Sequence, residues 1–133
     1  MQMEVNYIDE GRLEISARGH TVVTDQLEKD SVVNRGMTPL ELMAGALGSC
    51  VGVFAMEYLK RNKLPLEGLK VELDWVWADK PRRIESYTVK VTVPQQLTPR
   101  QQASLSRIVR ACTVHNTLQH PPKIDVELIG PDH

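Results

Sequence analysis

Thr38-Pro-Leu-Glu-Leu-Met-Ala-Gly-Ala-Leu-Gly-Ser-Cys50 is the stretch that decides the fold. A threonine followed by proline, with Glu41 three residues after the threonine, is typical of a helix that starts with a capping box. Basic residues followed by Pro65 mark its end. Because nearly every side chain in between is apolar or small, we expect a long central helix that is buried on all sides. A chain of this length cannot easily enclose such a helix, so a second chain is expected to help.

The segments around this helix alternate between apolar and polar residues, which is typical of half-buried strands. Thr98-Pro99-Arg100-Gln101 repeats the start signal and predicts a second helix. We therefore expect the order β-β-β-α-β-β-α-β, an α+β fold. No linker or repeat interrupts the pattern, so residues 1–133 are predicted to form a single domain. The predicted strands are 3–8, 13–17, 21–24, 69–77, 84–93 and 123–129.

The composition excludes several classes of function. The chain has sixteen basic and seventeen acidic residues, and it has no basic stripe that could bind nucleic acid. The apolar run from Leu42 to Met56 is shorter than the roughly 20 residues that a membrane span needs, so it is interpreted as a core helix. The first residues lack the basic and apolar regions of a signal peptide, which predicts a reducing, cytoplasmic location.

Cys50 and Cys112 are the two cysteines of the chain. Cys50 ends the Gly/Ala-rich run, and Cys112 extends an apolar stripe of Leu105, Ile108 and Val109, so it is predicted to point inward near the end of the second helix. Taken alone, each is explained as a small core residue. Cys112, His115 and His120 also suggest zinc, but their spacing fits no common four-ligand site, and no metal is predicted.

Two segments together resemble the osmotically inducible protein C and organic hydroperoxide resistance family (OsmC/Ohr): the quoted run to Cys50, and Ala111-Cys-Thr-Val-His-Asn-Thr-Leu118. The resemblance covers essentially the whole chain. It implies an intertwined homodimer whose central helices pack together, with two equivalent sites where the subunits meet. It also implies a peroxidase for organic hydroperoxides without a bound cofactor, rereduced by a dithiol such as a lipoyl group. Cys50 would attack the peroxide and Cys112 would resolve the sulfenic acid as a disulfide.

The resemblance further implies an arginine beside the thiolate, oriented by a carboxylate. Arg35, in the loop before the central helix, is the first candidate, and Arg18 is the second. Characterised peroxidases carry the glutamate directly after the helix-initiating proline, where this chain has Leu40, and Glu41 follows one residue later. One residue turns a side chain by about 100° around a helix. Glu41 is thus either the catalytic carboxylate or only part of the capping box.

Two functions from different classes follow. The first is a thiol-dependent peroxidase for organic hydroperoxides, with catalytic residues Cys50, Cys112, Arg35 and Glu41. The second is a non-catalytic dimer that binds a small apolar or electrophilic ligand in the same interface cleft, with its cysteines reduced. Phe54 fits either function, as part of the core or as an apolar wall beside Cys50.

Overall fold

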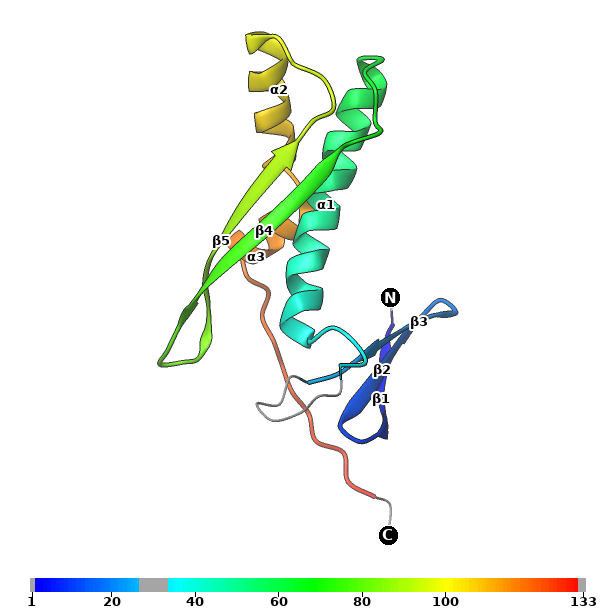
Figure 1. Ribbon diagram of the computed structural model, residues 1–133. Coiled ribbons are helices and arrows are strands. Elements are labelled where there is room, and N and C mark those ends of the chain that lie inside the picture. Colours follow the sequence, from blue (N-terminus) through cyan, green and yellow to red (C-terminus); the bar gives the residue numbers. More distant parts are fainter. Residues whose placement is uncertain (1, 27–33, 132–133) are drawn as a thin grey trace. The chain divides into compact units, whose positions relative to one another are not determined.

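The computed structural model describes residues 2–26 and 34–131, and it confirms a mixed α+β fold. The chain divides into two compact units, residues 1–46 and 47–133, and each is described by itself. Figure 1 shows the elements along the chain. In the described residues they are β1 (Glu4–Asp9), β2 (Arg12–Ala17), β3 (His20–Thr24), α1 (Pro39–Arg61), β4 (Lys70–Ala78), β5 (Arg83–Thr92), α2 (Pro99–Val109) and α3 (Thr113–Gln119).

The first unit contains an antiparallel meander in the order β1-β2-β3, as predicted. Both of its turns place two successive residues at positive φ, Glu10 and Gly11 in the first and Arg18 and Gly19 in the second. Two central residues at positive φ are the signature of the tight hairpin turn whose twist matches that of the strands. The turn residues therefore set the strand register, in which Ala17 faces His20 across the second hairpin.

The chain returns to β3 just before α1 begins. Met37 forms a parallel bridge with Thr24, and its carbonyl accepts from the Asp25 N–H at 3.2 Å. A Cβ atom on Gly36 would lie 2.7 Å from the carbonyl oxygen of Val23, so only glycine fits this crossing. The predicted capping box of α1 is confirmed. The Glu41 N–H donates to Thr38 Oγ1 at 3.2 Å, and the Thr38 N–H donates to Glu41 Oε1 at 2.9 Å.

Helix α1 is buried along only one side in the single chain, and the prediction that a second chain covers the other side stays a prediction. Ala55 and Leu59 are almost completely buried, whereas Met43 and Val53 are 39% and 45% exposed. The helix is long and apolar enough to cross a membrane by length and composition alone. Its buried side, however, forms part of two core clusters with the elements that follow it.

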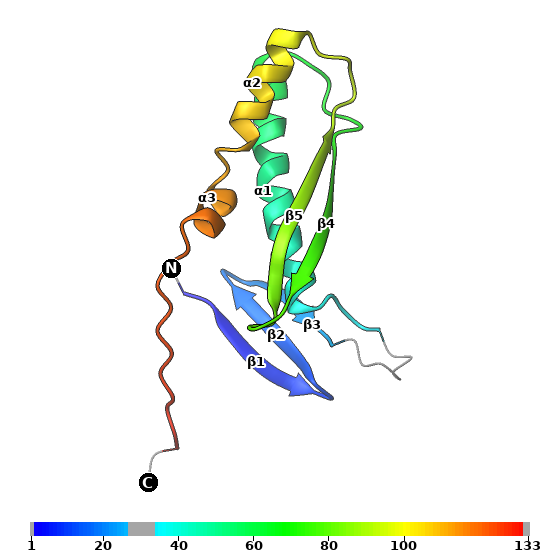
Figure 2. The same cartoon turned by 90° about the vertical axis from the view of Figure 1, so that its left-hand side faces the viewer.

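The second unit packs the β4–β5 hairpin and α2 against α1 (Figures 1 and 2). Leu73 and Val71 of β4 lie directly over glycines of α1, and a Cβ atom on Gly48 would meet Leu73 Cδ1 at 2.5 Å. The glycine therefore permits the close approach of strand and helix. Helix α2 begins at the predicted capping box, formed by Thr98 and Gln101.

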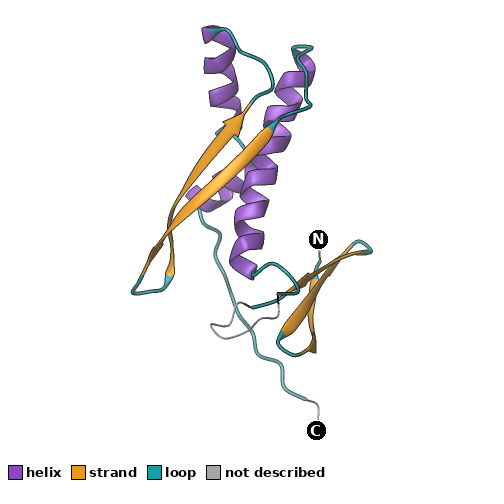
Figure 3. Cartoon of the chain, in the orientation of Figure 1, coloured by secondary structure: helices purple, strands orange, loops and turns teal. Residues whose placement is uncertain are grey.

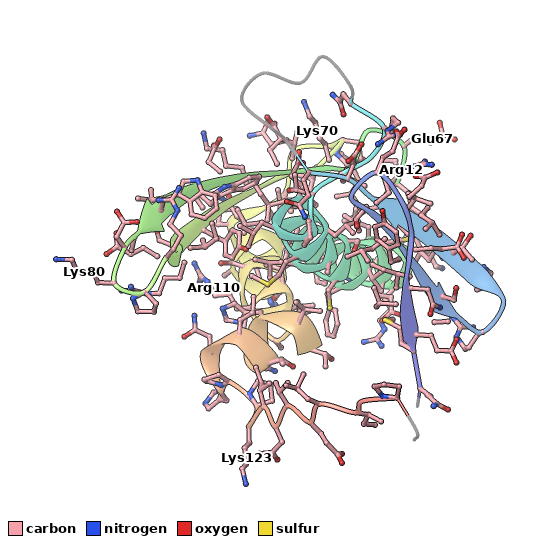
Figure 4. All side chains as sticks on the ribbon, turned by 90° about the horizontal axis from the view of Figure 1, so that it is seen from below. Arg12, Glu67, Lys70, Lys80, Arg110 and Lys123 are labelled. Carbon is pink, nitrogen blue, oxygen red and sulfur yellow. The ribbon has the colours of Figure 1, made fainter. Side chains whose placement is uncertain are left out.

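The C-terminal third departs from the prediction. Helix α2 ends at Val109, so Cys112 lies beyond it, and a third helix that was not predicted, α3, follows. The predicted strand 123–129 is wrong for the single chain, because the described residues 121–131 form no strand (Figure 3). Ile124, Val126 and Leu128 are 79–95% exposed, and the labelled Lys123 side chain points away from the ribbon in Figure 4. A strand needs a neighbour for its ladder of hydrogen bonds, and no described strand pairs with this segment.

Candidate active site

Cys112 is the N-cap of helix α3, a position that the sequence did not reveal. Its backbone is extended, with φ −63° and ψ 140°, and its Sγ accepts from the His115 N–H at 3.3 Å. The side chain is completely buried, which confirms that it points inward. Serine, threonine, aspartate and asparagine are the usual N-caps. The sequence pattern therefore hides the capping role of the cysteine.

Cys50 lies on α1, half-buried against the cluster formed by Leu47, Val51 and Cys112. Its sulfur lies beside the Cys112 thiol and the backbone N–H groups of Val114 and Thr113, which favour its charged form. Those N–H groups belong to the first turn of α3, which has no intrahelical acceptor for them. The two thiols, which lie far apart in the sequence, are thus neighbours at the start of one helix. Both are free cysteines.

The surroundings move the pKa values of the two thiols in opposite directions. Burial raises the pKa of Cys50, but the Val114 N–H, the Cys112 thiol and the Thr113 N–H together outweigh burial, so that this pKa falls below its usual range. Burial raises the pKa of Cys112; the His115 N–H opposes this effect, while the hydrogen bond to Cys50 and its charge reinforce it. Hydrogen bonds to a charged form favour that form, and a nearby like charge disfavours it. Cys50 therefore ionises first, with Cys112 as its thiol donor.

The other predicted site residues belong to the first unit. Arg35 donates from Nε to Asp25 Oδ2 at 3.2 Å and pairs with Glu10 at 2.7 Å. Arg18 occupies a hairpin turn, and Glu41 closes the capping box of α1. The contacts of Arg35 and Glu41 are therefore those of a loop anchor and a helix cap. Their catalytic roles stay predictions.

Two residues near the thiols carry unpartnered polar atoms, and the sequence did not single out one of them, Tyr87. The Tyr87 hydroxyl and the His115 Nδ1 atom are buried without a hydrogen-bond partner among the described residues. Tyr87 packs against the same cluster as Cys50, and its ring meets Trp75 edge-on, with the ring centroids 6.3 Å apart. Burial raises the pKa of Tyr87. The alternation along β5 already places Tyr87 on the same face as Val89, which is the signal that could have found it.

The surroundings of the thiol pair are apolar. Phe54 and residues of β4 and β5 pack against the cluster that contains Cys112. In the described part of the chain, no three His, Cys, Asp or Glu side chains gather as ligands for a metal ion. The site thus combines two neighbouring thiols with apolar walls.

The sequence model of OsmC-like proteins matches residues 29–127. The chain belongs to the OsmC-like family. Among proteins with curated descriptions, none matches it.

Solved structures show that the OsmC-like fold extends over the chain. An osmotic stress induced and detoxification response protein from Psychrobacter arcticus 273-4 matches with TM-score 0.79 and 20% identity, over 88% of this chain and 87% of that one. An OsmC-like protein from Mycoplasma pneumoniae matches with TM-score 0.73 and 13% identity, over 90% and 87%. An OsmC-like hydroperoxide resistance protein from Jannaschia sp. CCS1 matches with TM-score 0.56 and 20% identity, over 97% and 91%. At these identities the likeness is one of fold.

Proposed function

We propose that this OsmC-like protein is a thiol peroxidase that reduces organic hydroperoxides to alcohols as part of an oxidative stress response. The observation that carries the proposal is the hydrogen-bonded thiol pair, in which the pKa of Cys50 is lowered and that of Cys112 is raised. A two-cysteine peroxidase needs one thiolate that attacks the peroxide and one thiol that then resolves the sulfenic acid. Membership of a family with hydroperoxide resistance proteins among its structural relatives supports the same function.

The reaction uses the two sulfurs in turn. The Cys50 thiolate attacks the terminal oxygen of the hydroperoxide, the O–O bond breaks, and the alcohol leaves after it gains a proton. Cys50 is left as a sulfenic acid, which further peroxide would oxidise irreversibly. Cys112 attacks that sulfur, forms the disulfide and releases water. An external dithiol of the lipoyl type then exchanges with the disulfide and restores both thiols.

In this mechanism, the N–H groups at the start of α3 supply part of the thiolate stabilisation that the family resemblance assigns to an arginine. Val114 and Thr113 donate to Cys50 without any charged side chain. We propose Arg35, with Arg18 as the alternative, as the cationic group that adds to this effect. Glu41 is the proposed carboxylate, a second role for a side chain that already caps α1.

The apolar environment of the thiols supports an organic substrate over hydrogen peroxide. Phe54, Val71 and Leu73 offer carbon surface near Cys50 and no charge. Burial of an alkyl or aryl group against such surface is favourable, at about 25 cal/mol per Å² of apolar area. A small polar peroxide gains nothing comparable.

We also propose that the protein acts as a cytoplasmic homodimer. Met43 and Val53 are exposed on the open side of α1, and Ile124, Val126 and Leu128 alternate along an unpaired C-terminal segment. An apolar helix side and an unpaired strand pattern in one chain are the features that a second copy would cover. Sedimentation equilibrium should return twice the mass of the chain, and the mass of one chain would refute the dimer.

Turnover tests the proposed function. With dihydrolipoamide as reductant, the protein should consume cumene hydroperoxide catalytically, and Cys50→Ser should abolish consumption because serine is not nucleophilic at neutral pH. Cys112→Ser should react once and then inactivate, since the sulfenic acid has no resolving thiol. Full consumption by Cys50→Ser would refute the assignment. Thiols that survive hydroperoxide in the wild type would instead favour the ligand-binding dimer.

A further inference from the structure

Both unpartnered buried polar atoms of the described residues belong to side chains around the thiol pair. Tyr87 packs against the cluster that contains Cys112, which Cys50 also contacts. His115 carries the other unpartnered atom, Nδ1, and its backbone N–H donates to Cys112 Sγ. Proteins bury few polar groups without partners, because each loses its hydrogen bonds to water. Their concentration beside the thiols indicates that polar atoms of a ligand belong there.

The Tyr87 ring is held in a defined place. It pairs across the hairpin with Trp75, and the two rings meet edge-on at an interplanar angle of 67°. Its strand neighbour Val89 packs on the same cluster. Burial raises the pKa of the phenol, so the hydroxyl stays protonated and acts as a donor at neutral pH. A fixed, protonated hydroxyl in apolar surroundings can hold a developing negative charge.

We propose that the Tyr87 hydroxyl donates a hydrogen bond to the leaving oxygen of the hydroperoxide while Cys50 attacks the terminal oxygen, an inference that rests on the proposed peroxidase function. The sulfur–oxygen bond forms as the O–O bond breaks, and the O–O electron pair passes to the alkoxide oxygen. That oxygen takes the phenol proton and leaves as the alcohol. Cys50 is oxidised from thiolate to sulfenic acid, the hydroperoxide is reduced, and the phenolate regains a proton from solvent.

The basicity of the leaving group separates this role from mere packing. An alkyl hydroperoxide releases a strongly basic alkoxide, which needs a proton as it forms. A peroxy acid releases a carboxylate, which is stable without one. Removal of a general acid typically costs on the order of 10²-fold or more in rate. Tyr87→Phe should therefore slow the oxidation of Cys50 by cumene hydroperoxide by about that factor, and its oxidation by peracetic acid far less.

The test is single-turnover oxidation of Cys50 in wild type, Tyr87→Phe and Tyr58→Phe. Tyr58 is a buried tyrosine of the other core cluster, so its variant controls for the loss of a tyrosine hydroxyl away from the thiols. A selective loss with cumene hydroperoxide in Tyr87→Phe alone supports the proposal. Unchanged rates, or equal slowing with both oxidants, overturn it while the peroxidase function stands. A wild type that reacts with neither oxidant overturns both.

A second replacement keeps the test decisive if Tyr87→Phe does not fold. Difluorotyrosine at position 87 keeps the shape of the ring and makes the phenol more acidic. The rate with cumene hydroperoxide should then decline at lower pH than in the wild type, because the proton is lost earlier. A pH profile that does not move would overturn the proposal.

Discussion

At the residue scale, the two cysteines are distinguished by what donates to each sulfur. The Val114 N–H acts on both sulfurs, whereas the Thr113 N–H and the Cys112 thiol act on Cys50 and the His115 N–H on Cys112. Charge on Cys50 is therefore favoured, and once present it disfavours charge on its neighbour. These opposite pKa shifts support the proposal that Cys50 is the attacking sulfur and Cys112 the resolving one.

Alkylation of Cys50 as a function of pH should show a pKa below the value of about 8.5 that is usual for a free thiol. Because the lowered pKa favours the thiolate, iodoacetamide should label Cys50 at neutral pH well before Cys112. Cys112→Ala removes a donor and should raise the pKa of Cys50, while Cys112→Ser keeps an O–H donor and should raise it less. A pKa of Cys50 at or above that of Cys112 would contradict this account. Peptide mass mapping of the labelled thiols makes the measurement.

At the scale of elements, the thiol pair depends on where α1, the β4–β5 hairpin and α3 meet. Gly48 lies two residues before Cys50 and leaves room for Leu73 against α1. The first N–H groups of α3 lie beside the sulfur of Cys50. Strand and helix must keep this spacing for the cluster around Cys112 to stay closed. The surroundings of Cys50 therefore depend on Gly48 as well as on the cysteine itself.

Gly48→Ala should lower the free energy of unfolding by about 1 kcal/mol, because the new methyl group overlaps the end of the Leu73 side chain, which must move. Gly45→Ala is the matched control on the same helix. A Cβ atom there has nothing within 4 Å, so the substitution should stabilise the protein by up to about 1 kcal/mol through helix propensity. Urea denaturation measures both. Equal effects of the two substitutions would show that the close approach of β4 does not restrict the size of the side chain at position 48.

Local signals explain why some elements were predictable and others were not. The capping boxes at Thr38 and Thr98 depend on residues three apart, and both form as the sequence indicates. Helix α3 was missed because its cap is Cys112, a residue type that seldom caps. The strand predicted at 123–129 failed because its apolar alternation requires a partner, and no described strand of this chain pairs with it.

At the scale of the whole molecule, the chain has the OsmC-like fold, and the proposed chemistry depends on one contact between distant parts of the sequence. The family model spans most of the chain, and the solved relatives share its fold at no more than 20% identity. The pairing of the cysteines could be foreseen only through the OsmC/Ohr resemblance, since nothing local links positions so far apart. The N–H groups of α3 that distinguish the two cysteines could not be foreseen, because the helix itself was not predicted.

The mass of the intact protein after one equivalent of cumene hydroperoxide tests the central claim most directly. The account predicts the loss of two hydrogen atoms from one chain, the disappearance of both free thiols, and a single peptide crosslink between Cys50 and Cys112. Cys112→Ser, treated in the same way, should gain one oxygen on Cys50. Two thiols that remain titratable, or a crosslink only between chains, would contradict the account.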